Sequence, residues 1–180
     1  MELTSVSHLV TRAREGDQHA WGDLVERYLG MVHAICRGYR LGADDSADVN
    51  QVVWLRLVEH LTRIRAPAAV GGWIAATARN ECLRVLRASG RLVLTDDESV
   101  LDQLDVHDGS VDTGLLVYER DRALLEAFGH LGPRCQRLLR LMMVDPPPSY
   151  DEIAAALDMP VGSIGPTRGR CLEQLRHLLG

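Results

Sequence analysis

Apolar residues recur three or four positions apart through most of the 180-residue chain, which is the spacing of one face of an α-helix. Leu, Val and Ala supply most of these apolar positions and there is a single Phe, a composition that favours helices over sheets. The sequence therefore predicts an all-α protein. The pattern covers residues 5–15, 17–40, 49–64, 73–90, 115–144 and 151–179.

Helix-breaking and helix-capping residues separate these segments. Gly16 and Asp17 predict a helix end followed by an N-cap, and residues 41–48 predict a turn with Asp44 or Asp45 as the cap. The stretch RAPAAVGG at 65–72 and the stretch HLGP at 130–133 each predict a further break. After DPPP at 145–148, Ser149 with a Glu three residues later predicts a capping box.

Charge is distributed unevenly along the chain. Residues 96–121 hold nine acidic residues and one Arg, a net charge of −8, whereas the rest of the chain has a net charge of +3. Residues 92–113 also lose the helical spacing. We therefore predict two small helical domains, at 1–92 and 115–180, joined by an acidic flexible linker at 93–114. All twenty basic residues are Arg, which suits bidentate contacts with phosphate and base edges.

The cysteines and the apolar runs bear on the compartment. Cys36, Cys82, Cys135 and Cys171 form no CxxC pair, so we expect neither a metal site nor disulfides, and each should be a small buried apolar residue. No apolar run approaches the roughly 18 residues of a membrane span. The N-terminus lacks the basic-then-apolar order of a signal peptide. We expect a cytoplasmic protein without membrane insertion.

The C-terminal segment has the pattern of a helix-turn-helix, a short helix followed by a longer one with Arg in its first turns. The stretch PVGSIGPTRGRCLEQL at 160–175 would be the DNA-reading helix. Pro166 is tolerated in a first helical turn, where Ser163 would cap the free N–H groups. Gly165 and Gly169 would let this helix lie close to the DNA backbone, and Arg170 would reach a base edge or a phosphate. A helical hairpin with a purely structural role has the same pattern.

Two upstream stretches, DDSADVNQVVWLRL at 45–58 and GGWIAATARNECLRVLR at 71–87, resemble the bacterial RNA polymerase sigma factors of the extracytoplasmic-function (ECF) group of the sigma-70 family. The stretch SYDEIAAALDMPVGSI at 149–164 is similar to the helix-turn-helix of the same family, so the resemblance covers essentially the whole chain. Ala47 and Val52 lack expected carboxylates, Arg84 stands where Asp is usual, and GPTRGR departs from the commoner start of the recognition helix.

The resemblance implies a sigma2-like bundle that docks on core RNA polymerase and opens the −10 element, and a sigma4-like domain that recognises the −35 element. It implies three sets of site residues. Core polymerase would bind Asp45, Asp48, Gln51, Trp54 and Leu55. The −10 element would bind Arg79, Asn80, Arg84 and Arg87, next to the Pro67–Gly72 loop. The −35 element would bind Ser163, Gly165, Pro166, Thr167, Arg168, Gly169 and Arg170.

Opening a duplex requires a pocket for an extruded base and a surface on which bases stack. Trp73 could be that surface, although a core position is the simpler interpretation, and Asn80 could equally be an ordinary surface residue. The resemblance also implies that the acidic linker runs toward the polymerase active-site cleft; a solvated tether would have the same composition.

The expected partners are the beta and beta-prime subunits of core RNA polymerase and promoter DNA, and an anti-sigma factor is a further candidate partner. A two-domain helix-turn-helix regulator that does not bind core polymerase is the main alternative, and a protein–protein adaptor is another. The seven His are scattered, and no phosphate loop or nucleophile elbow is present, so we expect no enzymatic activity, no cofactor and no metal.

Overall fold

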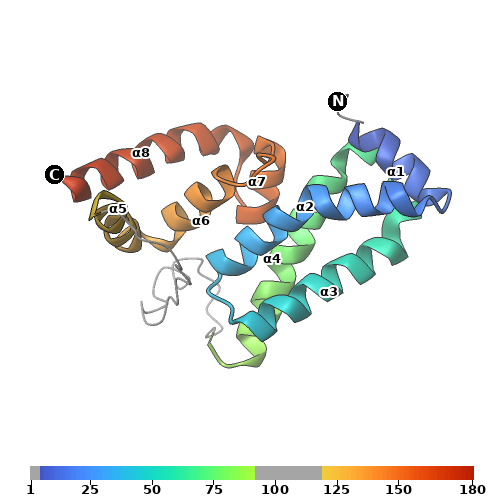
Figure 1. Cartoon of the computed structure of the whole chain (residues 1–180), viewed down its shortest axis with the longest axis horizontal. Helices are drawn as coiled ribbons and strands as arrows, with labels where there is room; N and C mark the ends of the chain where they lie inside the picture. Colours follow the sequence, from blue (N-terminus) through green and yellow to red (C-terminus); the bar gives the residue numbers. More distant parts are fainter. Residues whose placement is uncertain (1–4, 92–118) are drawn as a thin grey trace.

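The protein is described by a computed structural model that covers residues 5–91 and 119–180. Within those two stretches there are α-helices and two short 3-10 helices and no strands, so the all-α prediction is confirmed (Figure 1). The acidic linker, with boundaries predicted at 93 and 114, lies outside the described residues. The elements are α1 (Val6–Arg14), α2 (Gln18–Gly38), α3 (Ala43–His60), η1 (Leu61–Arg63), η2 (Pro67–Ala69), α4 (Val70–Ala88), α5 (Glu119–Gly129), α6 (Pro133–Met142), α7 (Tyr150–Leu157) and α8 (Val161–Leu179).

The predicted boundary between the first two helices is confirmed. Gly16 has a φ of +89°, a left-handed conformation that glycine adopts without steric cost. Asp17 is the N-cap of α2, and its carboxylate accepts hydrogen bonds from the backbone N–H groups of His19 and Ala20. These two hydrogen bonds, together with the Arg12 guanidinium, lower the pKa of Asp17 below its usual value.

The start of α3 differs from the prediction. Its N-cap is Gly42, which offers no side-chain hydrogen bond, and Asp44 and Asp45 both lie in the first helical turn. The expectation that one of these carboxylates caps the helix is therefore wrong. The two negative charges instead lie beside the positive end of the helix dipole, which they stabilise without a cap.

The C-terminal breaks are as predicted. The stretch HLGP separates α5 from α6, which begins at Pro133. The capping box at the start of α7 is complete, because the Ser149 hydroxyl accepts from the Glu152 N–H and the Glu152 carboxylate accepts from the Ser149 N–H at 2.7 Å. These local signals are short-range, so sequence alone locates them.

The break predicted at 65–72 is shorter than expected. Pro67 begins the 3-10 helix η2, and α4 follows directly from Val70, so Gly71 and Gly72 are helical. The prediction of a loop over Pro67–Gly72 is wrong in its second half. Two glycines disfavour a helix start by propensity, and the long-range packing of Gly71 described below favours it here.

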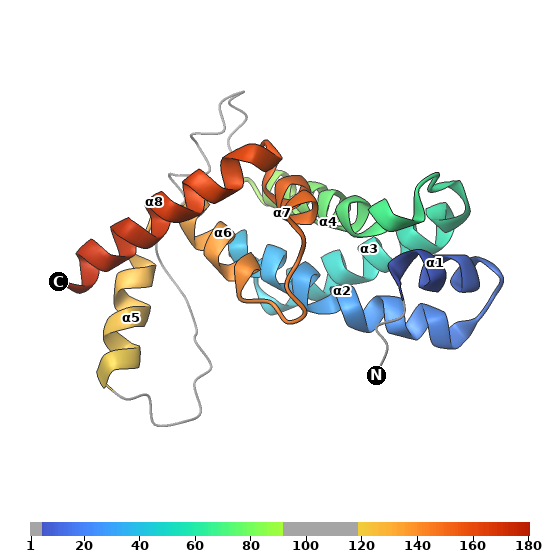
Figure 2. The same ribbon diagram turned by 90° about the horizontal axis from the view of Figure 1, so that it is seen from above.

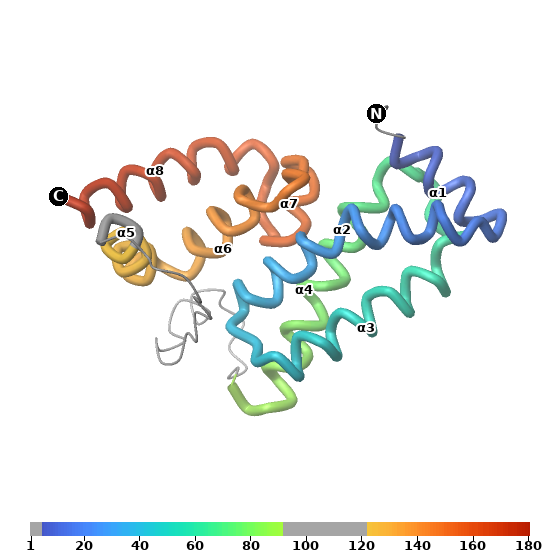
Figure 3. The backbone as a smooth tube through the Cα atoms, viewed as in Figure 1, coloured from blue at the N-terminus to red at the C-terminus, as the bar shows by residue number. Residues whose placement is uncertain are grey.

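The N-terminal helix group, α1–α4, and the C-terminal helix group, α5–α8, lie side by side and share one hydrophobic core (Figure 1). Helix α4 packs against α7, and α2 packs against α6 (Figure 2). The path of the chain can be followed in the tube of Figure 3, where α5 and the C-terminal part of α8 extend away from the first four helices. The arrangement leaves α3 on one flank of the molecule and α8 on the other. No helix of the described residues has the length and the apolar character to cross a membrane.

Candidate nucleic-acid interface

Three of the five residues predicted to bind core polymerase form one exposed face of α3. Asp48, Gln51 and Leu55 follow one another at intervals of three and four residues, and all three are exposed. The Leu55 side chain is 57% exposed, and Val58, which continues the same face, is 58% exposed. Two large aliphatic side chains beside carboxylate and amide groups make a surface of the mixed polar and apolar kind that protein partners bind.

Asp45 and Trp54 lie off this face. The Asp45 carboxylate is 4.0 Å from the Arg91 guanidinium, near the end of α4. The Trp54 ring packs against the core, and its Nε1 donates to Asn50 Oδ1 at 2.6 Å. The structure therefore gives these two residues contacts within the domain, and it brings only the other three together as an outward surface.

Helix α4 presents a second exposed face, made of Asn80, Arg84 and Arg87. Their spacing of four and three residues places an amide and two guanidinium groups on one side of the helix. This combination provides two phosphate-binding cations and one group that can pair with a base edge. Arg79 is about 100° around the helix from Asn80; its Nη1 donates to Asn80 Oδ1 at 3.3 Å, and its Nη2 makes a different contact.

The face on α4 is tied to α3 by a buried carboxylate that the sequence analysis missed. The Glu81 side chain is only 3% exposed and pairs with Arg56 of α3 at 2.6 Å and with Arg84 at 2.7 Å. Two cations around one buried carboxylate compensate the cost of removing its charge from water. Arg84, predicted as a DNA contact, is thereby held in place while its side chain stays 59% exposed.

Arg79 reaches the C-terminal group of helices. Its Nη2 donates to Asp158 Oδ2 at 2.7 Å, and only 17% of the Arg79 side chain is exposed. Asp158 ends α7 in a left-handed conformation, with a φ of 52°. A residue predicted to contact the −10 element is thus engaged by the turn of the helix-turn-helix.

A cavity of about 350 Å³ opens where α3 and η1 meet the start of α4. The Trp73 ring lies on its wall with its centroid 5.9 Å from that of His60. Trp73 is only partly buried: it packs against the core and also lines the cavity. Arg14 helps to hold the region, because its guanidinium donates to the Leu61 and Ile64 carbonyl oxygens. The cavity is lined by His60, Arg63, Ile64, Arg65, Ala66, Ala69 and Trp73.

The start of α8 differs from the prediction. The helix begins at Val161 with Pro160 as N-cap, so Pro166 is inside the helix, beyond its first turn. The Ser163 hydroxyl donates to the Pro160 carbonyl at 2.7 Å and caps no N–H group. The explanation that Pro166 needs no acceptor in a first turn is therefore wrong, and so is the capping role of Ser163. The Ser163 N–H donates to the Pro160 carbonyl at 2.9 Å, so the free N–H groups of this helix end are those of Val161 and Gly162.

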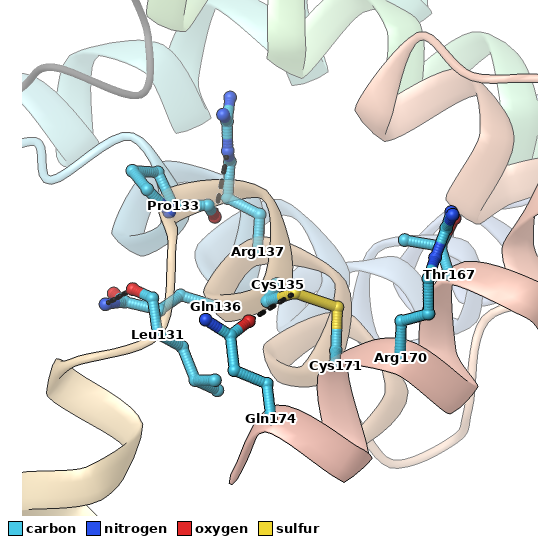
Figure 4. The surroundings of a disulfide bond; sticks show 9 residues. All are labelled: Leu131, Pro133, Cys135, Gln136, Arg137, Thr167, Arg170, Cys171 and Gln174. Carbon is cyan, nitrogen blue, oxygen red and sulfur yellow. Dashed lines mark hydrogen bonds between the residues drawn. A yellow bond between two sulfur atoms is a disulfide. The ribbon is translucent and has the colours of Figure 1, made fainter. Parts of the chain in front are cut away.

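The predicted residues around Pro166 nevertheless form an exposed stretch of helix. Gly165, Arg168, Gly169 and Arg170 are exposed, and no atom lies within 4 Å of where a Cβ would stand at either glycine. Thr167 is buried between them, and its hydroxyl accepts from Arg170 Nη2 at 3.2 Å (Figure 4). Arg170 is thus oriented by a neighbour of the same helix.

The cysteines divide into two pairs. Cys36 and Cys82 are buried thiols whose sulfur atoms are 3.9 Å apart, as expected of small core residues. Cys135 of α6 and Cys171 of α8 form a disulfide, which contradicts the expectation that no disulfide is present (Figure 4). Both pairs sit in apolar helices, so their local sequences do not distinguish them. Among the described residues, no cluster of three or more His, Cys, Asp or Glu could hold a metal ion.

Comparison with known proteins adds four similarities. The model of the family Sigma-70 region 2 matches residues 24–92. The ECF RNA polymerase sigma-E factor of Haemophilus influenzae is 27% identical over 94% of this chain and 92% of its own length, and the sigma-E factor of Escherichia coli strain K12 is 28% identical over 87% and 84%. The solved structure of CnrH in complex with the cytosolic domain of CnrY matches 98% of this chain with a TM-score of 0.61 at 21% identity, which shows a common fold.

Proposed function

Since the chain belongs to the ECF group of the sigma-70 family, we propose that it binds core RNA polymerase and directs it to promoters, where it recognises −10 and −35 elements and starts transcription. The proposal divides the chain into a sigma2-like domain at 1–92, a linker at 93–114 and a sigma4-like domain at 115–180. The observation that carries it is the exposed face of α3, whose Asp48, Gln51 and Leu55 match the family's polymerase-docking pattern.

Docking on core polymerase would use this α3 face. Exposed Leu55 and Val58 would be removed from water at the interface. The polar groups of Asp48 and Gln51 would fix the orientation of the two proteins. Asp45 and Trp54 would act by holding α3 in place. Replacing Gln51 and Leu55 by Ala together should weaken binding to core polymerase at least tenfold, by about 1.4 kcal/mol or more, without changing the helical spectrum.

The matched control replaces Gln18 and Glu26, two exposed residues of α2, by Ala. This control should bind core polymerase like the unmodified chain in a pull-down or a fluorescence titration. Unchanged affinity of the Gln51/Leu55 variant with an intact helical spectrum would contradict the assignment of α3.

Recognition of the −10 element would use α4 and the neighbouring cavity. Arg84 and Arg87 would bind phosphates of the opened strand, and Asn80 would pair with a base edge. The cavity beside Trp73 and His60 offers an aromatic wall for an extruded base. Recognition of the −35 element would use the exposed stretch Gly165–Arg170, with the free N–H groups at the start of α8 facing a phosphate.

The linker would act inside the polymerase through its charge. Replacing the Asp and Glu residues within 96–112 by Asn and Gln should then change the ratio of abortive to full-length transcripts more than it changes core binding. An unchanged ratio would favour a simple tether.

Run-off transcription with reconstituted holoenzyme tests the function as a whole. Specific start sites that depend on this chain support a sigma factor, whereas promoter binding without any association with core polymerase would support a separate helix-turn-helix regulator. Under this proposal the protein works in the cytoplasm with the polymerase and catalyses no reaction of its own. An anti-sigma factor is a further proposed partner, by analogy with CnrH, whose structure contains the cytosolic domain of CnrY.

A further inference from the structure

Arg56 of α3 and Arg84 of α4 are held by one carboxylate. Arg56 Nη2 is 2.6 Å from Glu81 Oε1, and Arg84 Nε donates to Glu81 Oε2 at 2.7 Å. The two guanidinium groups therefore use different oxygen atoms of the same side chain and lie next to each other where α3 packs against α4. We call these three side chains the Glu81 triad.

The Glu81 triad is buried on its inner side and open on its outer side. The Glu81 side chain is 3% exposed, whereas those of Arg56 and Arg84 are 44% and 59% exposed. Among the described residues, no second carboxylate pairs with either guanidinium. Each guanidinium has five N–H groups, of which the carboxylate occupies only part. The outer side of the triad is therefore a cationic surface with hydrogen-bond donors left for an anion.

The triad continues a face of α4 that carries other groups suited to a nucleic-acid strand. Trp73, Asn80 and Arg84 follow one another at intervals of seven and four residues, so they lie on the same side of the helix. At 1.5 Å per residue, roughly 16 Å of helix axis separate Trp73 from Arg84, which is the length of about five stacked nucleotides. A strand with a base in the cavity beside Trp73 would therefore reach the triad with its backbone.

We infer that Arg56 and Arg84 together bind a phosphate of the opened −10 strand, and that Glu81 is the positioning residue that sets the two guanidinium groups for it. The inference rests on the proposed function and adds Arg56, from the polymerase-docking helix, to the DNA-binding residues. Guanidinium groups present paired planar donors that match phosphate oxygens. Glu81 fixes both groups before the strand arrives, so less side-chain freedom is lost on binding.

The sign of one substitution distinguishes positioning from charge. Glu81→Gln removes a negative charge, which by charge counting alone strengthens the binding of an anion. A Gln side chain, however, offers one acceptor oxygen and an NH2 group that is itself a donor, so it cannot hold both guanidinium groups. Positioning therefore predicts that Glu81→Gln weakens the binding of DNA although the chain becomes more positive.

The first test measures binding of a fluorescent 12-nucleotide single-stranded DNA by the full-length chain over a range of salt concentrations. Glu81→Gln should bind about threefold more weakly than the unmodified chain, because two long side chains must be ordered on binding. Glu59→Gln is the matched control, an exposed carboxylate of α3 with the same change of net charge. It should bind as tightly as the unmodified chain or more tightly. A Glu81→Gln affinity equal to or above that of Glu59→Gln overturns the inference.

The salt dependence tests Arg56 itself. A cation that neutralises one phosphate of a single strand contributes about 0.7 to the slope of log affinity against log salt. Arg56→Gln should lower the slope by this amount and weaken binding about threefold to tenfold. Arg134→Gln, an exposed Arg of α6, has the same change of net charge and should keep the slope. An unchanged slope for Arg56→Gln overturns the inference, and a lowered urea midpoint in that case assigns the triad to folding alone.

A double-mutant cycle assigns the effect of Glu81 to the two cations. Glu81→Gln should weaken binding in the unmodified chain and should have no effect once Arg56 and Arg84 are both replaced by Gln. Glu81→Asp keeps a carboxylate on a shorter stem and should recover part of the affinity that Glu81→Gln loses. A loss through Glu81→Gln that persists without the two cations overturns the inference. If Glu81→Gln loses its helical spectrum, the salt slope of Arg56→Gln decides.

None of these measurements contains polymerase, so they separate the inference from the proposed function. A chain that binds the oligonucleotide as expected but does not associate with core polymerase in a pull-down rejects the proposed function and keeps the phosphate site. A chain that associates with core polymerase but has no measurable affinity for the oligonucleotide overturns the inference alone.

Discussion

Helices α4 and α8 are each 19 residues long and each has glycines near its start, yet α4 buries ten of its residues and α8 only three. The glycines also differ. Gly71 of α4 has no room for a Cβ, whereas its neighbour Gly72 and all three glycines of α8, Gly162, Gly165 and Gly169, face open space. A glycine in a helix thus has two unrelated causes, close packing within the chain and an exposed surface without a side chain, and only the environment tells them apart.

The two helices are also stabilised differently. Helix α4 contacts α2, α3 and α7 and is fixed by packing and by the Glu81 ion pairs. Helix α8 contacts α5, α6 and α7 along one side, buries Ile164, Thr167 and Cys171, and is joined to α6 by a disulfide. Helix α8 buries fewer residues than α4, and the covalent link compensates for part of that difference.

The largest effect should come from breaking this link. The disulfide closes a loop with a sequence separation of 36, and the loss of unfolded-state entropy in such a loop is worth roughly 3–4 kcal/mol. Reduction with dithiothreitol should therefore lower the urea midpoint for unfolding of the C-terminal helices α5–α8. Cys135→Ser with Cys171→Ala should lower it without reductant and should make the chain insensitive to dithiothreitol. A wild-type midpoint that does not respond to reductant would contradict the role assigned to the link.

The packing of α4 should be broken next most strongly by Gly71→Ala. The new methyl group meets Glu152 and the Tyr28 ring, and overpacking of this kind costs about 1–3 kcal/mol. Gly72→Ala is the matched control, because nothing lies within 4 Å of its Cβ position. It should raise the free energy of unfolding by up to about 1 kcal/mol through helix propensity. Equal effects of the two substitutions in urea unfolding would remove the distinction between packing and open glycines.

The sequence was sufficient for features that depend on near neighbours. The helical spacing, the Gly16–Asp17 boundary and the Ser149 capping box each need only a few consecutive residues. The start of α4 could not be predicted, because Gly71 is packed against Glu152, 81 residues later in the chain, and local propensity does not include that contact. The disulfide could not be predicted either, since Cys135 has the same apolar helical context as the free Cys82.

In the candidate site, too, helical spacing predicts some features, whereas others depend on residues far apart in the sequence. The shared face of Asn80, Arg84 and Arg87 follows from helical spacing, and separating Arg79 from it needs only the 100° step per residue. The pairing of Arg79 with Asp158 and the pairing of Glu81 with Arg56 are long-range. Glu81 lies at helical spacing from Ile74, Ala78 and Val85, and a glutamate on that apolar side of α4 was the available signal for a buried ion pair.

Substitution of Arg170 should have a smaller but specific effect, confined to DNA. Two residues separate Arg168 from Arg170, about 200° around the helix, so the two cannot share one face. Arg170 is oriented by Thr167, and a bidentate base contact is worth about 1–3 kcal/mol. Arg170→Ala should weaken holoenzyme binding to its mapped promoter about tenfold or more. Arg168→Ala should weaken it less and alike on all sequences, lowering the salt slope by about 1; the reverse order would show that Arg168 is the base-reading residue.

The smallest expected effect tests most directly whether the exposed glycines of α8 allow that helix to lie close to DNA. A Cβ at Gly169 would have nothing within 4 Å beyond its own helix backbone, so Gly169→Leu should stabilise the free protein by nearly 1 kcal/mol through helix propensity. If α8 lies close to the DNA backbone, the same side chain should weaken binding to the −35 element. Gly22→Leu in α2 is the matched control, an exposed helical glycine with equally open surroundings, and it should give the stabilisation alone. Urea unfolding and promoter binding by holoenzyme measure the two effects separately. A Gly169→Leu chain that is more stable and binds the promoter undiminished would mean that the glycines of α8 are not needed for close approach, and that their exposure has no function in DNA binding.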